Sequence, residues 1–169
     1  MRKITIGFSR PKARFQLFAD AIMAVDGSNF SHAYVRFHMD SYDRDVVFQA
    51  SGLKVNLIEW NNFQAIETVV KEFAIPTSNE TQLYVVQFAI DNLGAPYDIA
   101  GIVDVAAEKF AKLFGKKIKP PVSQNGYYCS ELVAHVLEDF FAAKLTTDQV
   151  KRMTPTDVYN YLLANPVEA

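Results

Sequence analysis

The sequence predicts a single α+β domain, residues 1–169, in which an antiparallel sheet packs against a helical part. In the first half, up to Ile75, short segments alternate hydrophobic and polar residues, which is typical of half-buried strands. From Asn79 onward, hydrophobic residues recur every three or four positions, which is typical of amphipathic helices. Because the strands come first and most helices follow, the pattern favours an α+β fold.

The first half is predicted to form a meander of antiparallel strands. The expected strands are Lys3–Phe8, His32–His38, Val46–Ala50, Leu53–Leu57 and Thr68–Ile75. A polar loop, Asp40–Asp45, is expected to join the second strand to the third. One helix is expected within this half, at Ala13–Val25, where hydrophobic residues recur at helical spacing.

The second half is predicted to contain helices with recognisable boundaries. They are expected at Asn79–Leu93, Ile99–Phe114, Cys129–Phe141 and Thr156–Leu163. Gly94 and Gly115 follow the first two, and glycine is the common residue just after a helix end. Pro155 precedes the last, where its fixed backbone angle suits a helix start. The sequence leaves open whether the Lys116–Ser123 loop is a lid over a site or a plain connection.

The composition argues against several classes of protein. Half of the residues are hydrophobic, which is typical of a globular chain rather than a disordered one. The net charge of -2 lacks the basic footprint of a nucleic-acid-binding protein, so no nucleic-acid partner is expected. The single cysteine cannot form an internal disulfide. No apolar stretch approaches the roughly 20 residues of a membrane helix, so no stable membrane span is expected.

The start of the chain favours synthesis in the cytoplasm. Met1–Phe8 begins with basic residues but turns into an alternating strand, without the apolar core and cleavage site of a signal peptide. The pattern is also compatible with association with a virion, or with export by another route.

Cys129 is the first candidate for chemistry because it opens a predicted helix after a loop that contains Gly126. A thiol in that place lies at the positive end of the helix dipole, which is expected to lower its pKa and favour the nucleophilic thiolate. The unpaired N–H groups of the helix start can also stabilise an oxyanion. From its position alone, a buried and unreactive cysteine is the alternative.

His32 is the candidate base, at the start of a predicted strand. An imidazole beside a thiol can accept its proton and later protonate the leaving group. A half-exposed strand histidine without a chemical role is the alternative. His38 lies six residues further along the strand and His135 nearly two turns into the cysteine helix, so neither is expected to reach the same thiol.

Gln49 is the candidate third residue, because it is the polar residue of an apolar strand expected to pair with the His32 strand. Its amide oxygen can accept an imidazole N–H and orient the ring. An ordinary outward-facing glutamine is the alternative. The histidines and the cysteine lack a tight metal-ligand spacing, and no Gly-rich phosphate loop or serine-hydrolase elbow is present. Neither a metal nor a cofactor is therefore expected.

Two short motifs resemble those of the NlpC-type papain-like hydrolases. Gly94–Tyr97 resembles the Gly-x-Pro-Tyr motif, and Cys129–Val133 resembles the Cys-Ser-x-Leu-Val motif. In this chain Phe30–His32 and Val47–Ala50 precede the cysteine helix. That order resembles the circularly permuted branch, the YiiX-like amidases.

A further motif, Thr154–Asp157, resembles the Thr/Ser-Pro-x-Asp turn that opens the last helix in that branch. The likeness extends from about Ile4 to Leu163, and it implies a circularly permuted papain-like (NlpC-type) fold. It also implies that Cys129 is the nucleophile and His32 the base. Gln49 would take the third position, where many permuted members have an acid, so lower activity or a different substrate is expected.

The resemblance also implies residues that contact the substrate. Tyr97 matches the family's Pro-Tyr tyrosine and is expected to contact substrate or oxyanion, with a merely packed aromatic ring as the alternative. Tyr128, beside the nucleophile, and Ser31, beside the base, are further expected contacts.

The function that follows is a cysteine peptidase or amidase that hydrolyses an amide bond through an acyl-enzyme. The expected substrate is a peptide, a peptidoglycan peptide or a lipid-linked amide. Two alternatives stay open: a lipid acyltransferase or thioesterase of the same fold, and a catalytically inert binding or structural module, for example in a phage particle.

Overall fold

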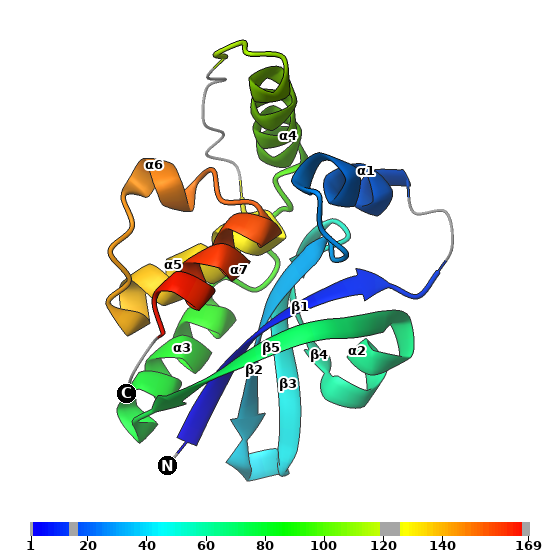
Figure 1. Cartoon of the computed structure of the whole chain (residues 1–169). Coiled ribbons are helices and arrows are strands. Elements are labelled where there is room, and N and C mark those ends of the chain that lie inside the picture. Colours follow the sequence, from blue (N-terminus) through cyan, green and yellow to red (C-terminus); the bar gives the residue numbers. More distant parts are fainter. Residues whose placement is uncertain (1, 14–16, 119–125, 167–169) are drawn as a thin grey trace.

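The computed structural model describes residues 2–13, 17–118 and 126–166 and confirms an α+β fold (Figure 1). In chain order the elements are β1 (Arg2–Pro11), α1 (Leu17–Asp26), β2 (His32–Met39), η1 (Asp40–Tyr42), β3 (Arg44–Ser51), β4 (Lys54–Glu59), α2 (Trp60–Ile66), β5 (Glu67–Thr77), α3 (Asn79–Asp91), α4 (Ile99–Leu113), α5 (Cys129–Phe141), α6 (Thr147–Val150) and α7 (Pro155–Ala164). None of the helices in the described ranges is both long and apolar enough to span a membrane.

The sheet has five antiparallel strands in the order β4-β3-β2-β1-β5. The predicted meander is correct for β2, β3 and β4, but it is wrong for β5. This strand pairs with β1 at the opposite edge, from Arg2↔Thr77 to Pro11↔Glu67. The reason is α2, a helix that the sequence analysis did not anticipate, which separates β4 from β5 and contacts both.

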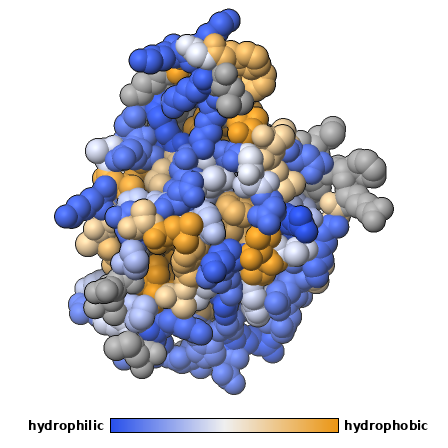
Figure 2. Space-filling view, viewed as in Figure 1, coloured by the Kyte–Doolittle hydropathy of each residue, from blue (hydrophilic) through white to orange (hydrophobic). Residues whose placement is uncertain are grey.

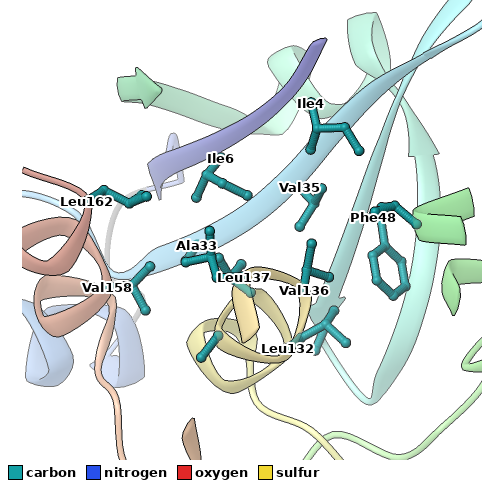
Figure 3. Close-up of a cluster of buried hydrophobic side chains, with 14 of the residues drawn as sticks. Ile4, Ile6, Ala33, Val35, Phe48, Leu132, Val136, Leu137, Val158 and Leu162 are labelled. Atoms are coloured by element: carbon teal, nitrogen blue, oxygen red, sulfur yellow. The ribbon is translucent and has the colours of Figure 1, made fainter. Parts of the chain in front are cut away.

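One face of the sheet packs against α5 and α7 and forms the main core (Figure 3). Strand residues such as Ile6, Ala33 and Val35 face Leu132 and Val136 of α5. Burial of one such aliphatic side chain stabilises the fold by about 1.5–3 kcal/mol. The hydrophobic face of α5 therefore holds this helix, and Cys129 at its start, against the centre of the sheet.

The other face of the sheet is covered by α2. Phe63 of this helix packs with Tyr34 and Val47, which alternate in sequence with the residues that face α5. Gly7 is required in β1 opposite Tyr34, because a Cβ there would lie 2.0 Å from an atom of the Tyr34 ring. The sheet is thus buried on both faces around β2.

Several helix boundaries differ from those predicted. The structure describes α1 only from Leu17, and the expected start at 13–16 lies mostly outside the described residues. The short α6 was not predicted, because four residues show no period. Most of the predicted Lys116–Ser123 loop, residues 119–123, lies outside the described ranges. Helices α1 and α4 pack against each other at one end of the molecule (Figure 1).

Candidate functional site

Two loops meet where α5 begins, and they position Cys129. Tyr127 forms a bridge with Tyr97, and its N–H donates to the Pro96 carbonyl over 3.1 Å. Gly126 makes this approach possible, since its φ is +101° and a Cβ there would lie 1.9 Å from the Pro96 oxygen. The loop before α4 and the start of α5 are therefore held together directly beside the thiol.

The Cys129 thiol is buried among hydrogen-bond donors. The residue is 2% exposed, and its Sγ lies 4.0 Å from the Ser31 carbonyl oxygen. Burial raises the pKa of the thiol, whereas hydrogen bonds from the N–H groups of Ala33 and Ser130 and from the Tyr97 hydroxyl act in the opposite direction. The expectation that the helix start lowers the pKa of Cys129 is thus wrong: its N–H donor acts as predicted, but desolvation outweighs it.

The His32 ring is oriented by Gln49. His32 Nε2 and Gln49 Oε1 are 2.7 Å apart, and Gln49 Nε2 donates to Asn56 Oδ1 over 3.2 Å. Because the amide oxygen only accepts, Nε2 carries the ring proton and Nδ1 of the neutral ring is an acceptor. Among the described residues none hydrogen bonds to Nδ1. The prediction that the Gln49 strand pairs with the His32 strand is confirmed.

The pKa of His32 is lowered by burial, while the negative charge of Glu67 and the hydrogen bond to Gln49 raise it. The protonated ring is thus disfavoured in the resting protein. Both buried groups, the thiol and the imidazole, are shifted toward their neutral forms.

A cavity of about 360 Å³ brings these groups together. It is lined by Pro11, Ala19, Ile22, Ser31, His32, Ala50, Ser51, Gly52, Glu67, Tyr97, Ile99 and Cys129. Four of the predicted residues (Cys129, His32, Ser31 and Tyr97) therefore share one space. Gln49, which is 4% exposed, lies behind the histidine rather than in the lining.

The thiol and the imidazole line the same cavity but are not hydrogen bonded to each other. Within the described ranges, no hydrogen bond joins Cys129 to His32, and the thiol instead faces the Ser31 carbonyl. Ala33 packs toward α5, whereas the His32 ring lies next to Tyr34 and Phe63, whose rings belong to the α2 side of the sheet. The two groups reach a common space because His32 is the first residue of β2 and Cys129 the first of α5.

Tyr128 is placed differently from what the sequence suggested. Its side chain is 1% exposed and packs with Ile22, Ile102 and Val105. Its hydroxyl donates to the Lys151 carbonyl over 2.8 Å. Tyr128 does not belong to the lining of the cavity that contains Cys129, because a residue and its neighbour at a helix start point in different directions.

The other two histidines lie away from the cavity, as expected. His38 contacts Asp45 at the far end of β2, with 2.9 Å between its Nδ1 and the carboxylate. His135 stacks edge-on against Tyr127. No group of three metal-ligating side chains occurs among the residues that the structure describes.

Glu67 is a cavity residue that the sequence analysis missed. The predicted strand began at Thr68, so the preceding acid was left in a connection, whereas β5 in fact begins at Glu67. No local pattern reveals it, because Glu67 and Thr68 are both polar between Ile66 and Val69, and only the pairing of β5 with β1 extends the strand back to Glu67.

A comparison with models of protein families found no family that matches this chain, and a comparison with curated proteins found no significant match.

Proposed function

We propose that this chain is a cysteine hydrolase in which Cys129 attacks an amide carbonyl and His32 acts as the base. The observation that carries the proposal is the 2.7 Å contact between His32 Nε2 and Gln49 Oε1. It leaves Nδ1 as the proton acceptor of a ring that shares a cavity with the only thiol of the chain. A thiol nucleophile needs such an acceptor, and in this proposal Sγ and Nδ1 come within hydrogen-bond reach when the substrate is bound.

The resting pair is neutral in this proposal, since burial raises the pKa of Cys129 and lowers that of His32. The proton passes from Sγ to Nδ1 as sulfur bonds to the carbonyl carbon, and the imidazolium then protonates the leaving amine. Water, deprotonated by the same nitrogen, releases the acyl group from sulfur. The N–H groups at the start of α5 and the Tyr97 hydroxyl are donors near the developing oxyanion.

A circularly permuted papain-like fold of the NlpC type is part of the proposal. The support is the chain order: histidine on one central strand, its amide partner on the next, and the cysteine later at the start of the helix packed on that sheet. The substrate class is a peptide, a peptidoglycan peptide or a lipid-linked amide, and the cavity admits a small acyl portion of it.

Acyl transfer to or from a lipid is the second candidate function, and one surface feature favours it. Ile99 lines the cavity, and Val103, Phe110 and Phe114 follow it along one face of α4 and its end, each at least half exposed. Hydrophobic residues reach the surface at several places on the face seen in Figure 2. An apolar stripe that begins at the cavity suits a substrate with a long hydrocarbon chain.

The test of the proposal is the rate of Cys129 alkylation by iodoacetamide between pH 6 and 10 in the wild type and in His32→Ala. At pH 7 we expect the variant to react about tenfold more slowly, because general-base assistance is lost. The difference should shrink as pH rises through the thiol pKa, where the thiolate forms without a base. A burst of p-nitrophenolate from p-nitrophenyl acetate, with one acetyl group found on Cys129, completes the test.

His38→Ala is the matched control, because His38 lies on the same strand but outside the cavity. It should alkylate like the wild type. Equal rates for the wild type and His32→Ala at every pH would refute a coupled pair and favour the inert binding module. Transfer of the acetyl group to an added alcohol in preference to water would favour the acyltransferase.

A further inference from the structure

Glu67 is the only acidic side chain in the described lining of the cavity. Its Oε2 accepts a hydrogen bond from the Ser9 hydroxyl over 2.9 Å, and Ser9 is fully buried. Within the described ranges Glu67 takes part in no ion pair. The carboxylate is therefore anchored at one oxygen and faces the cavity that contains His32.

The sheet places this carboxylate on the side of His32 opposite Gln49. Ser9 is the direct cross-strand partner of His32, so their side chains project from the same face of the sheet. Gln49 approaches the ring from β3, whereas Ser9 and Glu67 belong to β1 and β5, beyond the other side of β2. The imidazole thus stands between a neutral amide and an anchored carboxylate.

Among the residues that the structure describes, Glu67 is also the one charged group whose charge acts on the ring. The other titratable groups around His32 are Tyr34 on its own strand, and Cys129 and Tyr97 across the cavity. Burial raises the pKa of all three, so they are uncharged at neutral pH. A positive charge that forms on the imidazole therefore has Glu67 as its counter-charge within the described part of the cavity.

We propose that Glu67, held by Ser9, is a positioning residue that supplies the negative charge which Gln49 cannot give to the His32 imidazolium. This inference rests on the proposed function. In a triad with an acid, one carboxylate both fixes the tautomer of the imidazole and stabilises its positive charge. In this chain Gln49 fixes the tautomer through Nε2, and Glu67 stabilises the positive charge through space. When the Sγ proton reaches Nδ1, the ring becomes positive and the carboxylate lowers the free energy of that state.

The test measures the ring itself. The pKa of His32 is followed by NMR titration of its ring C–H signals in the wild type, Glu67→Gln and Glu72→Gln. Glu67→Gln retains the acceptor for Ser9 but removes the charge, so the His32 pKa should fall and alkylation of Cys129 at pH 7 should slow by about threefold. Glu72→Gln removes an equal charge from the same strand, where the carboxylate binds Arg36, and should change neither.

A rescue variant distinguishes the loss of negative charge from a general disturbance of the fold. Gln49→Glu in the Glu67→Gln background places a carboxylate on Nε2 and should raise the His32 pKa above that of Glu67→Gln alone. An unchanged His32 pKa in Glu67→Gln overturns the proposal for Glu67, even if His32→Ala still slows alkylation. If Glu67→Gln lowers the pKa but His32→Ala leaves alkylation unchanged, the charge assignment stands and the hydrolase proposal fails.

Discussion

At the scale of single residues, burial dominates the chemistry of the site. The pKa of Cys129 is raised and that of His32 is lowered, in both cases mainly by desolvation. Each shift favours the neutral form, so the resting pair is a neutral thiol and a neutral imidazole rather than a thiolate and an imidazolium. A substrate that enters the cavity therefore encounters a thiol whose proton must move during the attack.

The depressed pKa of His32 predicts a loss of stability in mild acid. The unfolded chain binds the proton at about pH 6.5, whereas the folded one binds it only at lower pH. Stabilisation is therefore complete above pH 6.5 and decreases as pH falls through the folded pKa. Thermal unfolding followed by circular dichroism should show a smaller decrease from pH 7 to pH 5 in His32→Gln than in the wild type.

His135 has a lowered pKa from the same cause, so His135→Gln should show a similar but separate reduction. A wild type and a His32→Gln variant with identical pH dependence would contradict the assignment.

The Tyr97 hydroxyl predicts a change in thiol reactivity. It hydrogen bonds to Cys129 and lowers the pKa of the thiol against the larger effect of burial. Tyr97→Phe retains the ring but removes the donor, so the midpoint of Cys129 alkylation should move to higher pH. Stopped-flow alkylation across pH 7–10 measures this shift, with Tyr42→Phe, an exposed tyrosine, as the control. A midpoint that stays in place would show that the hydroxyl does not act on the sulfur.

At the scale of elements, a partly buried ion pair connects the helices beside the site. Lys109 of α4 contacts Asp26 at the end of α1 over 3.0 Å, and it also reaches Asp157 and the Thr154 hydroxyl at the start of α7. Asp26 is 1% exposed in its side chain. One cation thus joins three helices, two of which pack at the end of the molecule near the cavity.

Removal of the Lys109 charge should lower the free energy of unfolding. Lys109→Met leaves a buried carboxylate without its counter-charge, and we expect a loss of about 3 kcal/mol in the free energy of unfolding. The double variant Lys109→Met/Asp26→Asn should recover much of it, because the buried charge is gone. Lys112→Met removes a lysine that is largely exposed, and Glu108 keeps its ion pair with Arg152, so this change should cost less than about 1 kcal/mol. Urea denaturation distinguishes these values, and equal losses for both single variants would contradict the argument.

At the scale of the whole molecule, the site lies on a seam between the strand half and the helix half of the chain. His32 and Glu67 come from the sheet, while Cys129 and Tyr97 come from the later segments. Two backbone hydrogen bonds join the halves here, from the Val55 N–H to the Ala95 carbonyl and from the Tyr97 N–H to the Leu53 carbonyl, and Gly126 packs against Pro96 of the same loop. The geometry of the site thus depends on packing between halves more than on either half alone.

Gly126→Ala tests the close contact with the Pro96 loop that holds the start of α5 beside this seam. The new Cβ would meet a backbone oxygen at 1.9 Å, and a φ of +101° is strained for alanine. We expect a loss of about 2 kcal/mol or more in the free energy of unfolding, with faster alkylation of a less protected thiol at high pH. Gly115→Ala has open space and a positive φ, so it isolates the backbone strain. If both variants lost equal stability, the close approach to Pro96 would be unimportant.

The sequence predicted individual elements and the pairing of neighbouring strands better than contacts between segments that are far apart in the chain. Alternation located β2 and a short apolar run located β3, and the expected pairing of these strands is confirmed because neighbouring strands in sequence pair easily. The edge position of β5 could not be predicted, since it depends on pairing with the first strand of the chain. The sign of the Cys129 pKa shift failed for a related reason: a helix start is visible in sequence, whereas burial comes from other elements.

The separation of the two site residues along the chain has a kinetic consequence. Ser31, whose carbonyl faces the thiol, and Cys129 are 98 residues apart. Bringing the ends of such a loop together costs about 4 kcal/mol in chain entropy, and the packing of α5 on β2 and β3 contributes to offsetting this cost. In the unfolded chain Cys129 is open to reagents, and in the folded chain it is buried. The single thiol therefore reports on refolding. Brief pulses of a thiol reagent, applied at different times after refolding begins, would measure the rate at which Cys129 becomes protected as α5 docks on the sheet.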